Sequence, residues 1–228
     1  MNNFRRFTIC CNNAGTGDDR AVGGEDCYHQ QHQNFLSNKG EPMEKVLLII
    51  GDAAEVFDTL YPLYRVREDD YEMVIAAPEK RTYHLVQHDT HPDWDITIES
   101  PGYKLKSDIA FRDIKPEEYV GMVITGGRAP EYLRYDQDLM KLVKYFFEKN
   151  LPVASVCHGI EIVAAADVIR GKTVTTVAKC QYDAEFSGGK YVNQEVVVDG
   201  NLVTARTWHD NHAFMREFMK LLNGRKKK

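Results

Sequence analysis

Continuous apolar runs alternate with segments of helical periodicity from residue 44 onward. Four such runs cover residues 45–50, 71–77, 120–125 and 153–156. Uninterrupted apolar stretches of this length are typical of strands buried on both faces of a parallel sheet. One helical segment places its apolar residues at Leu139, Leu142, Val143, Phe146 and Phe147. The pattern therefore predicts the α/β class, with a mostly parallel sheet covered by helices on both faces.

Two regions depart from this alternation. Shorter strands are predicted at 172–176, 195–198 and 202–205, and Asp199-Gly200 marks a hairpin turn between the last two. The section from about residue 79 to 108 is polar and contains several histidines, so it indicates an inserted hairpin or lid. We interpret His88 and His91 as surface residues of this insertion.

The first 42 residues are rich in Asn, Gly, Gln and Asp and show no periodicity. This composition predicts a disordered extension, followed by one domain over residues 43–224 and a basic tail over 225–228. The extension also contains possible metal ligands, but their spacing matches no zinc pattern. They are Cys10, Cys11, Cys27, His29 and His32.

Composition narrows the range of functions. The 228 residues are 43% hydrophobic and 28% charged, with a net charge of −5, which offers little to a nucleic-acid backbone. No apolar run approaches the roughly 18–20 residues of a membrane span. The five cysteines form no spaced framework, so reduced thiols in the cytoplasm are the simplest interpretation.

The strongest chemical signal is the run from Leu151 to Gly159. A short apolar strand ends at Cys157 and a helix-compatible stretch follows at once, which is the layout of a nucleophile elbow. The free N–H groups of the helix favour a thiolate, so we expect a lowered pKa for this thiol. His158 supplies an adjacent base or orienting group. The alternative is that Cys157 is a buried cysteine that packs as a small hydrophobe.

Two further loops follow strand ends, and in a parallel sheet these ends share one edge. Gly126-Gly127 permits a tight backbone whose N–H groups suit an oxyanion, and Glu131 follows in a helix N-terminal position. After the first strand come Glu55 and Asp58, three residues apart on one helical face. One of these carboxylates could serve Cys157 as a general acid or base.

Taken together, these motifs resemble the ThiJ/PfpI (DJ-one) superfamily over about residues 44–223. The resemblance rests on four ordered segments, which are Gly51-Asp52 with 58–62, 126–133, 154–159 and 196–204. The section from His88-Asp89 to Pro101-Gly102 is similar to the subgroup that includes plant tandem-domain members with glyoxalase activity.

The resemblance implies a flavodoxin-like three-layer sandwich with a nucleophile elbow, in a homo-oligomer (dimer, trimer or hexamer). It assigns the reactive thiol to Cys157 and its histidine to His158, with Glu131 reaching that histidine from a neighbouring subunit. The N–H groups of Gly127 and His158 would bind the oxyanion. The family's glutamate beside the thiol is here Asp58, one methylene shorter, and Glu55 is the alternative acid or base.

We therefore expect a cysteine-dependent, glutathione-independent enzyme acting on small reactive carbonyls or glycated protein, of glyoxalase or deglycase type. No metal and no organic cofactor is expected. The alternatives are an intracellular cysteine peptidase of PfpI type and a non-enzymatic oxidative-stress sensor or chaperone. Glutamine amidotransferases share the elbow but need a late His-x-Glu, which His209-Asp210-Asn211 does not supply.

Overall fold

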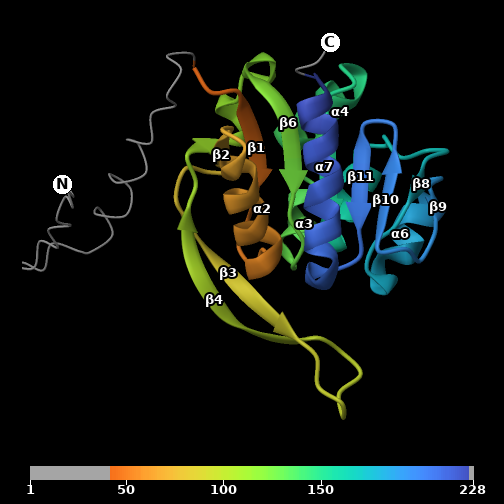
Figure 1. Ribbon diagram of the computed structural model, residues 1–228. Coiled ribbons are helices and arrows are strands. Elements are labelled where there is room, and N and C mark those ends of the chain that lie inside the picture. Colours follow the sequence, from red (N-terminus) through yellow and green to blue (C-terminus); the bar gives the residue numbers. More distant parts are fainter. Residues whose placement is uncertain (1–41, 226–228) are drawn as a thin grey trace, which may run out of the picture. The chain divides into compact units, whose positions relative to one another are not determined.

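The computed structural model describes residues 42–225, which are built around a seven-stranded sheet (Figure 1). The strand order is β10-β11-β7-β6-β1-β2-β5, and every pairing is parallel except that of β10 with β11. The strands are β1 (Lys45–Ile49), β2 (Glu72–Ala77), β5 (Ile109–Ala110), β6 (Tyr119–Ile124), β7 (Val153–Val156), β10 (Val196–Asp199) and β11 (Leu202–Ala205). The predicted α/β class with a mostly parallel sheet is confirmed.

The helices cover this sheet on both faces. They are α2 (Val56–Glu68), α3 (Ala129–Leu133), α4 (Gln137–Glu148), α5 (Ile160–Ala165), α6 (Gln181–Phe186) and α7 (Asn211–Arg225). Helices α2 and α7 pack side by side in front of the sheet in Figure 1, and α3 and α4 lie behind it. The central strands β1 and β7 are buried almost throughout, as their apolar runs predict.

Short 3₁₀ turns mark the ends of several elements. They are η1 (Phe111–Asp113), η2 (Pro116–Glu118), η3 (Cys157–Gly159), η4 (Ala178–Cys180) and η5 (Trp208–Asp210). Two of these turns, η3 and η5, lie at the carboxyl ends of β7 and β11, which are adjacent strands. They therefore bring distant parts of the sequence to the same edge of the sheet.

An antiparallel hairpin projects from the body of the protein, as the polar insertion predicted (Figure 1). It consists of β3 (Thr82–Asp89) and β4 (Ile98–Lys106), and we call residues 82–106 the arm. A β-bridge between Glu55 and Val86 ties the base of the arm to the start of α2. The arm is therefore attached next to the loop that follows β1.

A further two-stranded sheet lies beside β10, at the edge of the main sheet (Figure 1). It pairs β8 (Thr173–Val174) with β9 (Lys190–Tyr191) in parallel. The first of the three late strands predicted from the sequence thus belongs to this small sheet, whereas the other two form the edge of the main sheet. The hairpin predicted at Asp199-Gly200 joins β10 to β11.

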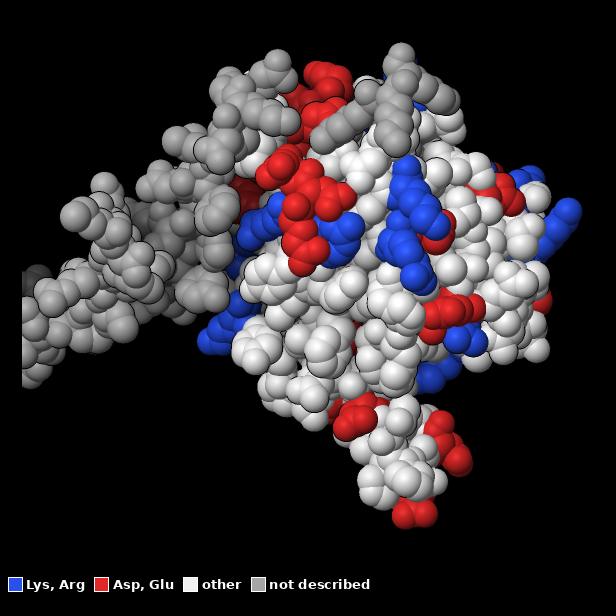
Figure 2. Space-filling model, viewed as in Figure 1, with Lys and Arg blue, Asp and Glu red and all other residues white. Residues whose placement is uncertain are grey.

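On the face seen in Figure 2, acidic and basic side chains are interspersed over the body of the protein.

Residues 1–41 and 226–228 lie outside the described residues, and so do the expectations for the extension, its cysteines and histidines, and the end of the basic tail. Within residues 42–225, no helix combines the length and the apolar character needed to cross a membrane.

Candidate active site

Cys157 occupies the sharp turn between β7 and η3, directly before α5. Its φ is 57°, in the left-handed region that residues other than glycine rarely adopt. Backbone strain of this kind is costly and collects at functional positions. The side chain is 3% exposed, so a substrate must reach the sulfur at the bottom of the site. The nucleophile elbow predicted from the sequence is present.

Gly126 is the point where the thiol and a carboxylate meet. A Cβ placed on this residue would lie 2.5 Å from Oδ2 of Asp58 and also 2.5 Å from Cβ of Cys157. Only a glycine leaves room for both side chains here. Gly127 follows with a φ of 79° against the backbone of Ala53 and Glu55. The two glycines therefore let the loop after β6 pass between the loop after β1 and the elbow.

The first turn of α2 positions Asp58. Glu55 caps the helix, and its Oε2 accepts a hydrogen bond of 2.7 Å from the backbone N–H of Asp58. Asp58 is fully buried, and its Oδ1 accepts a hydrogen bond of 3.1 Å from Nδ2 of Asn211 at the start of α7. Its other oxygen is thereby directed to Gly126 and the elbow. The shorter side chain of aspartate still reaches this site.

Burial raises the pKa values of the two carboxylates, Asp58 and Glu55. It raises the pKa of Asp58 well above its usual range, and the nearby Glu55 carboxylate adds to this rise. Burial also raises the pKa of Glu55 to about 7. Two buried acids of like charge cannot both ionise cheaply, so a proton remains in this pair near neutral pH. A carboxylate with a raised pKa is a stronger base once it does ionise.

The expected lowering of the Cys157 pKa is wrong. Burial raises the pKa of this thiol, and the negative charge of Asp58 raises it further. The backbone N–H groups of His158 and Gly127 lower the pKa of the thiol, but by less. Position at a helix start favours a thiolate only where desolvation and neighbouring carboxylates do not outweigh it.

His158 faces a different set of side chains. Its Nδ1 lies 3.4 Å from Oε1 of Glu161, which belongs to the same chain. Burial lowers the pKa of His158. Glu131 is exposed, and its Oε1 lies 3.5 Å from Nε of Arg128. The carboxylate nearest to the His158 ring within one chain is therefore Glu161.

The arm brings a histidine to the site, which corrects the interpretation of His88 as a surface residue. The His88 side chain is 8% exposed, and its Nε2 lies 3.1 Å from Oε2 of Glu99. Its ring centroid is 6.1 Å from that of Trp208. His88 shares the buried face of β3 with Tyr83 and Leu85, whereas nearly all of β4 is exposed.

The structure thus brings together Cys157, His158, Asp58, Glu55 and Gly127, and leaves Glu131 at the margin. Sequence reasoning missed Asn211, Glu161, Cys180 and the buried state of His88. A signal existed for Glu161, which follows His158 by three residues and shares its helical face. No local pattern pointed to Asn211, which lies 153 residues from Asp58.

The fold and the site define an α/β protein with a cysteine at the strand-to-helix turn of a parallel sheet. The chain belongs to the DJ-1/PfpI family, whose model matches residues 44–221. It is 36% identical to a deglycase of Thermococcus kodakarensis over 178 residues, which are 78% of this chain and 99% of that one. It is 33% identical to the deglycase PfpI of Pyrococcus furiosus, with the same coverage.

Two further comparisons extend the relationship. The protein DJ-1 homolog D of Arabidopsis thaliana is 31% identical over 186 residues, 78% of this chain and 48% of that one. A ThiJ/PfpI domain protein from Brachyspira murdochii has the same fold, with a TM-score of 0.70 and 18% identity. This comparison covers 81% of this chain and 99% of the other. The flavodoxin-like sandwich expected from the resemblance is thereby established.

Proposed function

We propose that this protein is a cysteine-dependent, glutathione-independent enzyme acting on small reactive carbonyls, of glyoxalase or deglycase type. Its relatives named deglycases support the enzyme class. The observation that carries the proposal is the meeting of Cys157 and Asp58 at Gly126, where a thiol and a base of raised pKa flank one point.

The first step forms a bond between the sulfur of Cys157 and the aldehyde carbon of a dicarbonyl such as methylglyoxal. The thiol proton passes to the carboxylate of Asp58, and the carbonyl electron pair moves onto oxygen. The N–H groups of Gly127 and His158, which lower the pKa of the resting thiol, are close enough to stabilise this oxyanion. Asp58 then passes the proton to this oxygen, which gives a hemithioacetal and leaves the carboxylate ionised for the next step.

The second step moves a proton between adjacent carbons. Asp58 removes the proton from the former aldehyde carbon while the neighbouring carbonyl oxygen takes up a proton, which gives an enediol. Asp58 then returns a proton to the neighbouring carbon as the hydroxyl on the former aldehyde carbon loses its proton. The product is a thioester of a 2-hydroxy acid on Cys157. Water then cleaves the thioester, releasing lactate from methylglyoxal and restoring the thiol. A glycated amine, which is an early adduct of the same aldehyde, follows the same reaction steps once the amine has been released.

The deep burial of Cys157 favours a small substrate over a peptide. A protein chain would have to displace the elements above a side chain that is 3% exposed. Within residues 42–225, no hydrogen bond joins the His158 ring to the Cys157 thiol, which a peptidase pair would need. The same residues hold Cys157 and Cys180 as free thiols, in keeping with a reducing cytoplasm.

We also propose that the protein acts as a homo-oligomer. Aromatic side chains on the outer side of α2 are exposed, and so is Tyr103 on the neighbouring arm; on α2 they are Phe57, Tyr61 and Tyr64. Exposed apolar groups gathered in this way favour association. A comparison of Glu131→Gln with Glu161→Gln tests whether a neighbouring subunit contributes Glu131 to the site.

The decisive experiment is turnover of methylglyoxal by the purified protein without glutathione, in deuterium oxide. We expect lactate with deuterium at the hydroxyl-bearing carbon, because Asp58 exchanges its proton with solvent before returning it. Cys157→Ala abolishes lactate formation, whereas the control Cys27→Ser, which lies outside the described residues, retains it.

Other results select other functions. Lactate without deuterium at that carbon would mean that the hydrogen migrates without exchange with solvent, and would contradict a solvent-exchanging proton shuttle at Asp58. Absence of lactate, together with cleavage of a fluorogenic peptide that depends on Cys157, would establish the peptidase alternative. Absence of both, with peroxide-dependent mass gain at Cys157, would establish the sensor alternative.

A further inference from the structure

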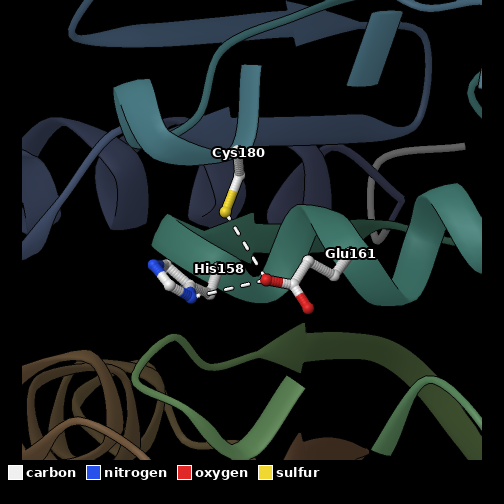
Figure 3. A group of neighbouring side chains, drawn as sticks. All are labelled: His158, Glu161 and Cys180. Carbon is white, nitrogen blue, oxygen red and sulfur yellow. Dashed lines mark hydrogen bonds and ion pairs between the residues drawn. The ribbon is translucent and has the colours of Figure 1, made fainter. Parts of the chain in front are cut away.

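Three side chains that can bind metals converge behind the elbow (Figure 3). They are His158 from η3, Glu161 from α5 and Cys180 from η4, and Figure 3 shows all three directed to one point. Nδ1 of His158 lies 3.4 Å from Oε1 of Glu161, and Sγ of Cys180 lies 3.5 Å from the same oxygen. The carbonyl chemistry proposed above uses neither Glu161 nor Cys180 as a reacting group.

The donors of this cluster are buried but poorly satisfied. The side chain of Glu161 is 7% exposed, and Cys180 is 2% exposed. In the part of the chain that the structure describes, Nδ1 of His158 has no hydrogen-bond partner. Buried polar atoms without a partner are costly and call for an explanation, such as an ion.

The separations match the edges of a metal tetrahedron. Bonds of about 2.0 Å to nitrogen or oxygen and about 2.3 Å to sulfur give edges of about 3.3 Å between nitrogen and oxygen and about 3.5 Å between oxygen and sulfur. The two observed separations, 3.4 Å and 3.5 Å, agree with these values. All three donor atoms lie within 4.8 Å of one another, so a small rotation of one side chain closes the third edge.

The second oxygen of Glu161 is already supported from outside the cluster. Nη1 of Arg134 lies 3.3 Å from Oε2 of Glu161 and 3.3 Å from Oδ1 of Asp183. The guanidinium therefore contacts the oxygen that faces away from the other two donors. Partners of this kind fix the orientation of a ligating carboxylate and leave its other oxygen for the metal.

We propose that His158, Glu161 and Cys180 form a binding site for zinc or a similar borderline-soft divalent cation. Nδ1, Oε1 and Sγ are the ligand atoms, and Cys180 releases its proton to solvent when it binds. A thiolate with an imidazole excludes magnesium and calcium, which prefer oxygen ligands. Three protein ligands leave a fourth position open for water. This site was not expected from the sequence, where no metal was predicted.

The test is titration of the full chain with cobalt(II), whose bond to a thiolate gives a charge-transfer absorption band. Cys10, Cys11 and Cys27 lie outside the described residues and are replaced together by serine in every sample, because they could also bind the metal. We expect one cobalt per chain and displacement of the band by zinc. The band persists with Cys157→Ser and disappears with Cys180→Ser.

A second variant keeps the outcome clear if Cys180→Ser does not fold. Glu161→Gln has nearly the same size as the native residue and is expected to weaken cobalt binding by at least about tenfold. The matched control Glu185→Gln, an exposed carboxylate on α6, leaves binding unchanged. No band in the serine background, or a band that survives both Cys180→Ser and Glu161→Gln, overturns the proposal. Lactate formation is measured separately, so either proposal can fail without the other.

Discussion

The two sides of the Cys157 elbow are built in contrasting ways. On one side, the backbone N–H of Asp58 donates a hydrogen bond to Glu55, and its carboxylate accepts one from Asn211; these two partners come from opposite ends of the domain. On the other side, His158 and Glu161 come from one turn of chain and contact each other at 3.4 Å without hydrogen-bond geometry.

Asp58 is therefore held in one position, whereas His158 and Glu161 are free to rearrange. A proton-transferring carboxylate needs a fixed position relative to the thiol, and hydrogen bonds with Glu55 and Asn211 hold Asp58 there. Both sides contain a buried atom without a hydrogen-bond partner among the described residues, Oδ2 of Asp58 on one and Nδ1 of His158 on the other, but no hydrogen bond fixes the His158 ring. The variants below test this contrast, beginning with the largest expected effect.

Gly126→Ala removes the common point of both groups. The added Cβ would lie 2.5 Å from Oδ2 of Asp58 and from Cβ of Cys157, so both must shift. We expect lactate formation to fall by more than about 100-fold and the free energy of unfolding to fall by about 1–3 kcal/mol. Gly224→Ala is the control, since its Cβ would meet no atom within 4 Å. Wild-type turnover in Gly126→Ala would disprove the juxtaposition.

Asp58→Asn removes the base and keeps the shape. We expect kcat for lactate formation to fall by about 100-fold, with folding retained. Asp58→Glu keeps a carboxylate but must fit an added methylene into a fully buried space, so we expect it to retain more activity than Asp58→Asn. If Asp58→Asn is silent and Glu55→Gln is damaging, the acid/base role belongs to Glu55.

Glu161→Gln compared with Glu131→Gln decides which carboxylate orients His158. Measured with a chelator present, Glu161→Gln is expected to lower kcat by about tenfold with little change in KM, because Glu161 faces the ring within the chain. Glu131→Gln is expected to have a smaller effect. A larger effect of Glu131→Gln, together with specific activity that falls on dilution, would instead assign the role to a neighbouring subunit.

Asn211→Ala removes the amide that contacts Asp58 at 3.1 Å. The hydrogen bond from Asn211 lowers the pKa of Asp58, so its loss raises that pKa. The ionised base then appears at higher pH, and the acidic limb of the kcat/KM profile moves to higher pH. We expect about a threefold loss of kcat/KM at neutral pH. An unshifted acidic limb would show that Asp58 does not control the profile.

Glu55→Gln has the smallest expected effect, and the quantity that we predict is its stability. Burial raises the pKa of Glu55 from 4.5 to about 7, so the folded state binds more protons than the unfolded state between these values. The stabilisation is therefore complete at low pH and is lost as pH rises to about 7. Glutamine has no such loss, so the variant gains about 1 kcal/mol relative to wild type between pH 5 and 8. Denaturant melts of both proteins, with exposed Glu148→Gln as control, measure this.

Part of the candidate site could be predicted because some of its residues lie in recognisable local sequence motifs. The strand-turn-helix at Cys157, the paired glycines after β6 and the carboxylates after β1 each follow a buried strand. Since parallel strands end at one edge of the sheet, their proximity was expected from order alone. Asn211 and Cys180 follow no such rule, and only packing brings them to Asp58 and Glu161.

The alternation of apolar runs and helical segments determined the class of fold, because each buried strand and amphipathic helix must be covered by another element. The pKa values of the site residues were decided only by the tertiary structure. From the sequence, Cys157 at a helix start favoured a lowered pKa, yet burial and the closeness of Asp58 raise it. Desolvation and charge act over distances of a few ångströms in three dimensions, and no spacing along the chain specifies those distances.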